Sequence, residues 1–275
     1  MLFETHQLPE PLDAFVESVF HFKGLIPDHS IERVVPTGHV FLIFELDGMT
    51  RNTFDNETLE ANGTFTKVWI SGVHRNYISI SAHHDSEMFV IQFKPFGAYP
   101  FLGESLENLN EKVLPAEEVL GNEVLVLREF LFEKTTSVDK FLVAENWLKK
   151  RFKEEATPPA DLVSFYEQMQ IDPTACYLET AEEYPNTQKH LIDQFKKYVG
   201  LTPKYSQRIL RFNEILQKVK QEEKVSWAKI AYECGFTDQS YFIKEFKHFS
   251  GFNPQEFIKQ DFDQDENFFP LDREG

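Results

Sequence analysis

Cysteine is scarce in this 275-residue chain, which contains only Cys176 and Cys234. Two thiols cannot form a disulfide framework or a four-thiolate zinc site, and so few cysteines are typical of a protein from a reducing compartment. Glycine and proline number only 12 and 14, which excludes a collagen-like or linker-like chain.

Long apolar runs are missing as well. No stretch approaches the roughly 18 apolar residues of a membrane span, and the densest run, HVFLIF, has the length of a strand. The first residues, MLFETHQLPEPLD, lack the basic and apolar regions of a signal peptide. We therefore expect a cytoplasmic protein with no membrane partner.

Basic residues are outnumbered by acidic ones, 28 to 45, which gives a formal net charge of -17. The imbalance is uneven, because residues 186–260 hold 13 Lys and Arg against 8 Asp and Glu, a net charge of +5. Residues 1–185 hold 14 against 31, and residues 261–275 hold 1 against 6. A local basic block can attract nucleic acid despite an acidic whole, although charge alone leaves a solvated surface equally open.

The remaining composition supports two globular domains. Hydrophobic residues make up 41% of the chain and aromatic residues 15%, which is enough for packed cores. Apolar residues recur at helical spacing over 115–133 and 137–152, ATPPAD breaks the chain, and nearly everything from Leu162 onward reads helical. Four earlier segments rich in β-branched and aromatic residues predict the strands of a small sandwich or barrel: 34–46, 66–73, 76–82 and 87–94.

An internal repeat is the most informative feature. The segments TQKHLIDQFKKYVGLTP (187–203) and DQSYFIKEFKHFSGFNP (238–254) match at a constant offset. Each begins with a good N-cap residue, carries one apolar helical stripe, and ends with a glycine suited to a C-cap, followed by a proline. We interpret this as a duplication.

The second copy follows WAKIAYECGF (227–236), in which the small Ala231 permits a close helix crossing and Gly235 suits a tight turn. This order of helix, turn and capped helix is the helix-turn-helix pattern. The first copy has a looser counterpart over 175–186, with Pro185 and Asn186 at the turn. Two helical hairpins packed as a bundle remain the alternative.

The segment KIAYECGFTDQSYFIKEFKHFSGFNPQEF (229–257) resembles the C-terminal signature of the AraC/XylS-type transcriptional regulators. Similarly, LIDQFKKYVGLTPKYSQRILRFNEIL (191–216) resembles their first helix-turn-helix and linker helix, whereas VVPTGHVFLIFELDG (34–48) and residues 93–105 are similar to their cupin-like sensory domain. The resemblance implies an α+β multidomain fold: a cupin-like sensory and dimerisation domain with a helical collar (1–155), a linker (156–171), an all-α domain of two helix-turn-helix units joined by a linker helix (172–260), and an acidic tail (261–275).

In that family the second helix of each unit enters the major groove, in grooves about one turn apart. Glutamine can pair with adenine and lysine with guanine, while helix N-termini and further lysines hold phosphates. The predicted base contacts are Gln239, Ser240, Tyr241 and Lys244 in the second unit and Gln188, Lys189, His190 and Asp193 in the first. The predicted phosphate contacts are Thr187, Lys196, Lys197, Lys204 and Lys247.

The first unit departs from the family pattern at Asp193, where a base-reading arginine is common. A carboxylate facing phosphate is repulsive unless it accepts from a cytosine amine, so we expect the second unit to carry most of the sequence readout. His190 is equally open to being a solvated helix residue. Arg211, on the linker helix, is expected to pair with an acid between the units, with a contact to DNA as the alternative.

Two other functions compete. A metal-dependent cupin-type enzyme would need a cluster of histidines, and His39, His74 and His83 are the weak suspects. The usual cupin metal signature is absent, as are a nucleophile elbow, a Walker A motif and a dinucleotide fingerprint, so we expect no enzyme, cofactor or metal. The second alternative is control by protein–protein interaction through the apolar stripe of 115–133 and 137–152.

The sequence therefore predicts a DNA-binding transcription regulator that reads two successive major grooves and is controlled by a signal in its N-terminal domain. Its expected partners are double-stranded DNA, a small-molecule effector, a second copy of the chain, and RNA polymerase if it is an activator. The acidic tail is expected to dock or to fray, with inhibition of the basic face as an alternative.

Overall fold

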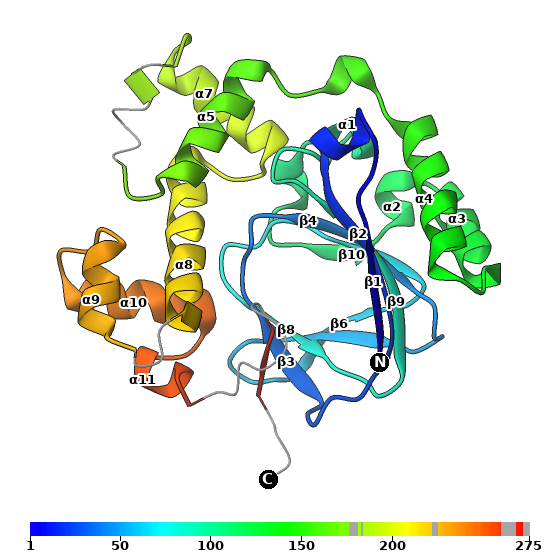
Figure 1. Ribbon diagram of the computed structural model, residues 1–275, viewed down its shortest axis with the longest axis horizontal. Coiled ribbons are helices and arrows are strands. Elements are labelled where there is room, and N and C mark those ends of the chain that lie inside the picture. Colours follow the sequence, from blue (N-terminus) through cyan, green and yellow to red (C-terminus); the bar gives the residue numbers. More distant parts are fainter. Residues whose placement is uncertain (176–180, 183, 222–224, 260–267, 272–275) are drawn as a thin grey trace.

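The computed structural model describes residues 1–275 except 176–180, 183, 222–224, 260–267 and 272–275. A front domain of sheets and helices lies beside a helical domain that begins at residue 160 (Figure 1). The predicted fold class is confirmed: a β-rich N-terminal domain precedes a helical C-terminal domain. Among the helices that the structure describes, none has the length and apolar character needed to span a membrane.

Two antiparallel sheets build the front domain. The first has six strands in the order β1 (Leu2–His6), β2 (Val16–Leu25), β9 (Ser86–Phe93), β4 (Val40–Glu45), β7 (Val68–Ser71) and β10 (Val113–Pro115). The second has five strands in the order β11 (Phe268–Pro270), β3 (Ile31–Val34), β8 (Ile78–Ser81), β5 (Arg51–Phe54) and β6 (Ala61–Phe65).

The observed strands are more numerous than the predicted ones. Strands β7, β8 and β9 lie in the segments predicted for them, but the predicted strand 34–46 is interrupted, because β3 ends at Val34 and β4 begins at Val40. Gly38 between them has a φ of 82°, which a continuous strand does not allow. Six further strands were not predicted: β1, β2, β5, β6, β10 and β11.

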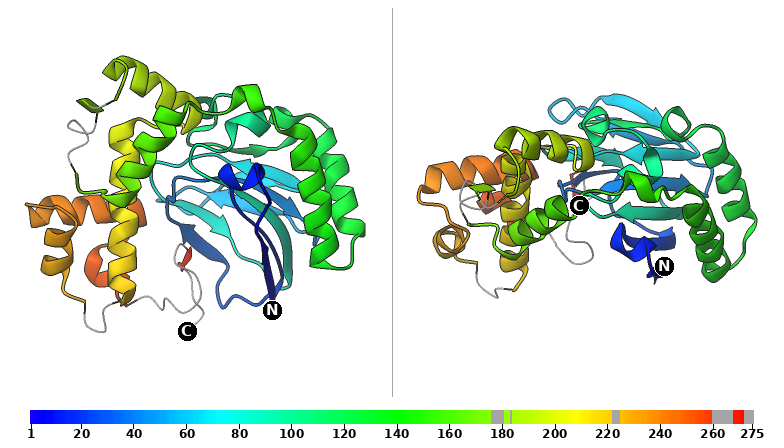
Figure 2. Two further views of the ribbon diagram at one scale, coloured as in Figure 1. Left: turned by 45° about the horizontal axis from the view of Figure 1, so that its top comes forward. Right: turned by 90° about the horizontal axis from the view of Figure 1, so that it is seen from above.

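Both faces of the first sheet are apolar. Leu42 and Phe44 of β4 are buried in one cluster with residues of α3 (Glu123–Glu133) and α4 (Ser137–Arg151). Ile43, which lies between them, joins a separate cluster with Phe65 of β6, because successive strand residues point to opposite faces. The helices α3 and α4 thus cover the outer face of this sheet (Figure 2), and Phe65 of β6 packs on its inner face.

The helical collar is more divided than predicted. The segment 115–133 contains the end of β10, α2 (Glu117–Leu120) and α3, with Gly121 at a φ of 74° between the two helices. The short α1 (Tyr99–Leu102) and the 3-10 helix η2 (Leu106–Leu109) precede it. Two more 3-10 helices are η1 (Leu12–Ala14) and η3 (Glu154–Ala156).

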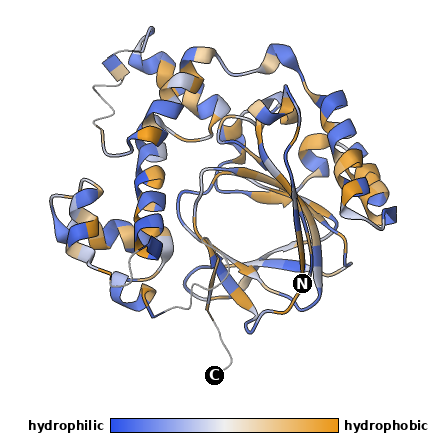
Figure 3. Ribbon diagram, viewed as in Figure 1, coloured by the Kyte–Doolittle hydropathy of each residue, from blue (hydrophilic) through white to orange (hydrophobic). Residues whose placement is uncertain are grey.

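The helical domain contains α5 (Ala160–Ile171), α7 (Gln188–Tyr198), α8 (Pro203–Gln221), α9 (Trp227–Glu233), α10 (Gln239–Ser250) and α11 (Pro254–Phe257). The long helix α8 runs beside the front domain, with α5 and α7 at one end and α9 and α10 at the other (Figure 1). Its apolar stripe alternates with polar residues along its length (Figure 3). Helix α5 occupies most of the segment expected to be a linker.

The segment expected to be an acidic tail contains a strand. Phe268–Pro270 form β11, which pairs antiparallel with β3 of the front domain. Phe269 is 1% exposed, and its ring centroid lies 4.9 Å from that of Phe257 at the end of the helical domain. This short strand therefore joins the front sheet to the second helix-turn-helix unit.

Candidate nucleic-acid interface

Each candidate recognition helix begins at the predicted N-cap. The Thr187 hydroxyl accepts a hydrogen bond from the backbone N–H of His190, with 3.2 Å between Oγ1 and N. The Asp238 carboxylate accepts from the backbone N–H groups of Ser240 and Tyr241, at 2.6 and 3.2 Å. Such caps satisfy donors that would otherwise be unpaired in the first turn, so the sequence determines locally where both helices start.

The predicted glycines have the left-handed backbone that their positions require. Gly200 follows α7 with a φ of 84°, Gly251 ends α10 with a φ of 75°, and Gly235 has a φ of 73° between α9 and α10. A side chain at any of these positions would be strained, because L-residues rarely adopt positive φ. Ala231 of α9 is buried, as a close crossing of the two helices demands.

Helix α10 presents the predicted face to solvent. Its buried stripe consists of Phe242, Phe246 and Phe249, which pack on α8 and α9. The predicted contacts all lie on the exposed side of the helix: Gln239, Ser240, Tyr241, Lys244 and Lys247. The arrangement offers amide, hydroxyl and ammonium groups to one groove, as base readout needs.

Helix α7 likewise has one buried apolar stripe and one exposed polar face. Leu191, Phe195 and Tyr198 are buried against α5. The four predicted base contacts are exposed: Gln188, Lys189, His190 and Asp193. The His190 ring stacks on that of Tyr184, with 6.4 Å between centroids, so this side chain is exposed yet positioned.

The linker helix α8 is tied rigidly to the second unit. Arg208 donates from Nε and Nη2 to both carboxylate oxygens of Glu245 on α10, at 2.8 and 2.7 Å. Arg211 has a structural role, but the prediction that an acid is its partner is wrong. Its Nε and Nη2 donate to the carbonyl oxygen of Cys234 at 3.1 and 3.0 Å, and its guanidinium lies over the Phe236 ring. A carbonyl at the end of α9 is a fitting acceptor, because helix C-termini carry unpaired acceptors and partial negative charge.

Two family models match separate parts of the chain. Residues 181–260 match a family model described as a helix-turn-helix domain, and residues 4–115 match one described as a domain of unknown function. The C-terminal region is an AraC-type helix-turn-helix domain. This AraC-type domain makes the chain a DNA-binding transcription regulator.

Solved structures of ToxT from Vibrio cholerae are similar along most of the chain. An apo ToxT variant is 15% identical with a TM-score of 0.47, over 88% of this chain and 97% of ToxT. ToxT bound to an unsaturated fatty acid is 17% identical with a TM-score of 0.45, over 93% of this chain and 94% of ToxT. None of the curated proteins is significantly similar in sequence.

Two of the predicted phosphate contacts of the AraC-type domain are engaged by the front domain. Lys196 Nζ lies 2.8 Å from Oε1 of Glu107 in η2, and this hydrogen bond raises the pKa of the lysine. Lys197 Nζ lies 4.6 Å from the centroid of the Tyr99 ring in α1. At the end of the same helix, a Cβ on Gly200 would lie 2.9 Å from the carbonyl oxygen of Leu106, so the backbones approach closely.

The second unit of the AraC-type domain also touches the front domain. Tyr205 donates its hydroxyl proton to the carbonyl oxygen of Arg75 at 3.0 Å, and its oxygen lies 2.7 Å from Nε2 of His248 on α10. Arg33 of β3 donates to the carbonyl oxygen of Gly251 at 3.1 Å and lies over the Phe252 ring. Sequence reasoning missed these residues, as it missed Glu107 and Tyr99, because isolated arginines, tyrosines and glutamates carry no motif.

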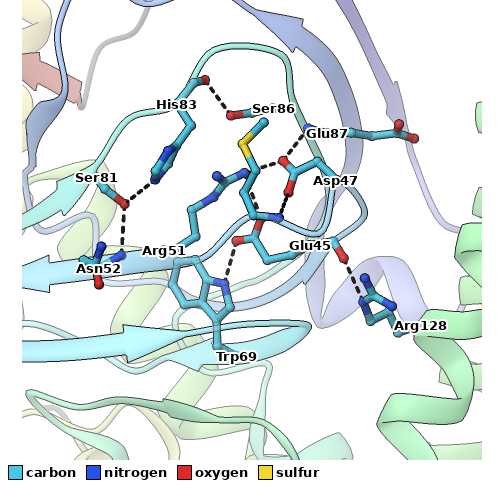
Figure 4. Close-up of polar contacts among 11 residues, drawn as sticks. Glu45, Asp47, Arg51, Asn52, Trp69, Ser81, His83, Ser86, Glu87 and Arg128 are labelled. Carbon is cyan, nitrogen blue, oxygen red and sulfur yellow. Dashed lines mark hydrogen bonds and ion pairs between the residues drawn. The ribbon is translucent and has the colours of Figure 1, made fainter.

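The three suspect histidines do not form a metal site. Burial lowers the pKa of both His39 and His74 to about 4, and His74 Nε2 lies 3.1 Å from the Ser71 hydroxyl. His83 lies beside Ser81, with 2.9 Å from its Nε2 to the serine hydroxyl (Figure 4). In the part of the chain that the structure describes, no group of three His, Cys, Asp or Glu residues could hold a metal ion.

The residues around His83 form a buried ion-pair network instead. Arg51 lies 3.0 Å from Glu45 and 2.5 Å from Asp47, and Trp69 donates its indole N–H to Glu45 at 2.8 Å (Figure 4). Burial raises the pKa of Glu45 to about 7. These contacts connect β4, β5 and β7, so we assign the network a structural role.

Proposed function

We propose that α7 and α10 read two successive major grooves, and that a signal received by the front domain controls this reading. The observation that carries the proposal is the pairing of two equivalent capped helices, each with an exposed polar face, on either end of one linker helix. The contact of Lys196 with Glu107 supplies the route for control, because a phosphate and a carboxylate compete for the same ammonium group.

Selection of binding sites from a pool of random duplexes, followed by affinity measurement over a salt series, tests the DNA-reading part. We expect an enriched site with two recognisable halves about one helical turn apart. Each lysine that neutralises a phosphate should contribute about -0.9 to the slope of log affinity against log salt. Enrichment of a single short half-site, or affinity independent of salt, would contradict the proposal.

The Glu107→Gln substitution should tighten DNA binding up to about fivefold. It removes the charge that holds Lys196 while keeping the shape of the side chain, and exposed ion pairs are weak competitors. Fluorescence anisotropy with the selected duplex measures the change. Glu17→Gln, an exposed site on β2, is the matched control and should leave affinity unaltered. Weaker binding by Glu107→Gln would contradict the competition.

We propose that the outer faces of α3 and α4 form a homodimer contact. Val126 and Phe130 lie one turn apart on α3 and are 53% and 51% exposed, and Val138 and Leu142 repeat the arrangement on α4 at 62% and 51%. Exposed apolar patches of this kind mark protein–protein contacts.

Sedimentation velocity should therefore show a dimer that Phe130→Lys and Leu142→Lys each convert to monomer, because a charge is introduced into an apolar contact. Lys150→Glu, on an exposed site of α4, is the control for a change of charge alone. A monomeric parent protein would contradict this proposal and would favour control by another protein at the same surface, including RNA polymerase if the chain is an activator.

A further inference from the structure

The front domain contains an open groove between its two sheets. The groove has a volume of about 850 Å³, which is within the range of small-molecule sites. One wall comes from β5, β6 and the loop after β5, and the other from η2, β10 and α2. Its aromatic lining is provided by Phe54, Phe65 and Tyr77.

The charge of the lining is strongly one-sided. One lysine, Lys112, faces five carboxylates: Asp55, Glu57, Glu104, Glu111 and Glu118. His74 adds no positive charge at neutral pH, because burial lowers its pKa to about 4. A concave surface with charges of one sign concentrates ligands of the opposite sign, and aromatic rings attract cations further.

The carboxylates retain hydrogen-bonding capacity. Glu111 accepts from the backbone N–H of Arg75, and Glu104 accepts from the side-chain amide of Asn108. Each bond occupies one oxygen, whereas a carboxylate offers about four acceptor positions. Glu57 and Glu118 are exposed and lie on opposite walls, where they can hold two positive charges of one molecule.

The walls of the groove continue into the contacts with the AraC-type domain. Glu111 holds the N–H of Arg75, whose carbonyl oxygen accepts from Tyr205 of α8. The guanidinium carbon of Arg33 lies 4.6 Å from the centroid of the Tyr77 ring. The same guanidinium donates a hydrogen bond to the carbonyl oxygen of Gly251.

The 3-10 helix η2 connects the groove to α7, because neighbouring residues of its single turn face the two sites. Asn108 faces the groove, while Glu107 holds Lys196 of α7. A ligand in the groove therefore touches elements that position both units.

From this geometry we propose that the groove binds a small organic polycation of the amine class, and that its occupancy alters the docking of α7 and α8 on the front domain. The inference rests on the proposed function, since it names the chemical class of the signal and the residues that transmit it. It commits to amines over sugars or organic acids, because the five carboxylates set the sign of the charge.

Calorimetric titration of the full chain with spermidine at roughly 150 mM salt, where long-range attraction is screened, tests the ligand class. We expect saturable binding of spermidine and none of 1,4-butanediol or succinate. The double variant Glu57→Gln/Glu118→Gln should weaken spermidine binding about tenfold or more, because each substitution removes a carboxylate that accepts a charge-assisted hydrogen bond from an ammonium group.

The double variant Glu17→Gln/Glu133→Gln removes the same charge from exposed positions away from the groove and should bind as the parent does. Equal weakening in both variants would reduce the effect to general attraction by an acidic protein and overturn the site. Absence of spermidine binding, or binding of succinate instead, would overturn the amine class.

Hydrogen–deuterium exchange without DNA tests the transmission. At a spermidine concentration that saturates the parent only, spermidine should change the exchange of amides in residues 188–200 and 203–221 in the parent and much less in Glu57→Gln/Glu118→Gln. Binding without such a change would overturn the coupling. DNA binding measured without spermidine is independent of these outcomes, so loss of DNA binding alone would identify a failure of the proposed function.

Discussion

Replacing Phe269 with alanine should lower the free energy of unfolding by up to about 3–5 kcal/mol, the range for truncating a buried phenylalanine. The ring is 1% exposed and lies 4.9 Å from Phe257 and 6.3 Å from Phe252, so its removal leaves a cavity between the front sheet and the helical domain. Because β11 is an edge strand that pairs only with β3 among the described strands, it can detach by itself, and the loss cannot exceed the free energy of its docking. Urea denaturation of the full chain measures the change.

Phe268 provides a matched control on the same strand. It is 36% exposed, so Phe268→Ala should cost less than about 1 kcal/mol. Loss of β11 should also raise the exchange of those amides of residues 31–34 that face β11, because β3 loses one of its two partner strands. Equal effects of the two substitutions would show that Phe269 does not anchor the strand.

Lys244→Ala should weaken binding to the selected DNA site by about 1–3 kcal/mol, which is roughly 5- to 150-fold, and should relax the base preference at one position. The side chain is exposed on the polar face of α10, where an ammonium group can donate to guanine O6 and N7. Asp193→Ala, at the repeat-equivalent position of α7, should be neutral or should tighten binding, because it removes a negative charge that faces phosphates. Competition between the selected and a scrambled duplex measures both variants.

Lys150→Ala, in the front domain, is the control for loss of one positive charge. If Lys244 contacts only phosphate, affinity should fall uniformly for all sequences and the salt slope should drop by about one. Loss of specificity in Asp193→Ala with a silent Lys244→Ala would assign the main readout to the first unit.

Local signals explain why the helical domain could be predicted well. Thr187 and Asp238 cap helices that start next to them, and Gly251 ends the helix that precedes it. Such effects act within one turn, so a single chain displays them without any knowledge of its neighbours. The duplication strengthened them, because the same pattern of caps, stripe and glycine occurs twice.

The strands that escaped prediction lack this local clarity. In β2, the register shifts between Val16 and Ser18, and the buried His21 bonds Ser137 and Glu87 far along the chain. The shift breaks the alternation that marks a strand, and a histidine at a core position hides the apolar face. Strand β11 has three residues, and its partner lies at the other end of the sequence.

The sequence by itself determined the second helix-turn-helix unit, the capped helix α7, the polar faces of α7 and α10, and the succession of a β-rich and a helical domain, since caps, turns and periodicity act between near neighbours. The predicted first helix of the first unit, within 175–186, lies largely outside the described residues. Only the tertiary structure decided that Glu107 forms an ion pair with Lys196, that Phe269 joins β11 to the second unit, and that five carboxylates line one groove. Each of these depends on residues distant in the chain. Their proximity arises from the packing of whole sheets and helices, which no local pattern encodes.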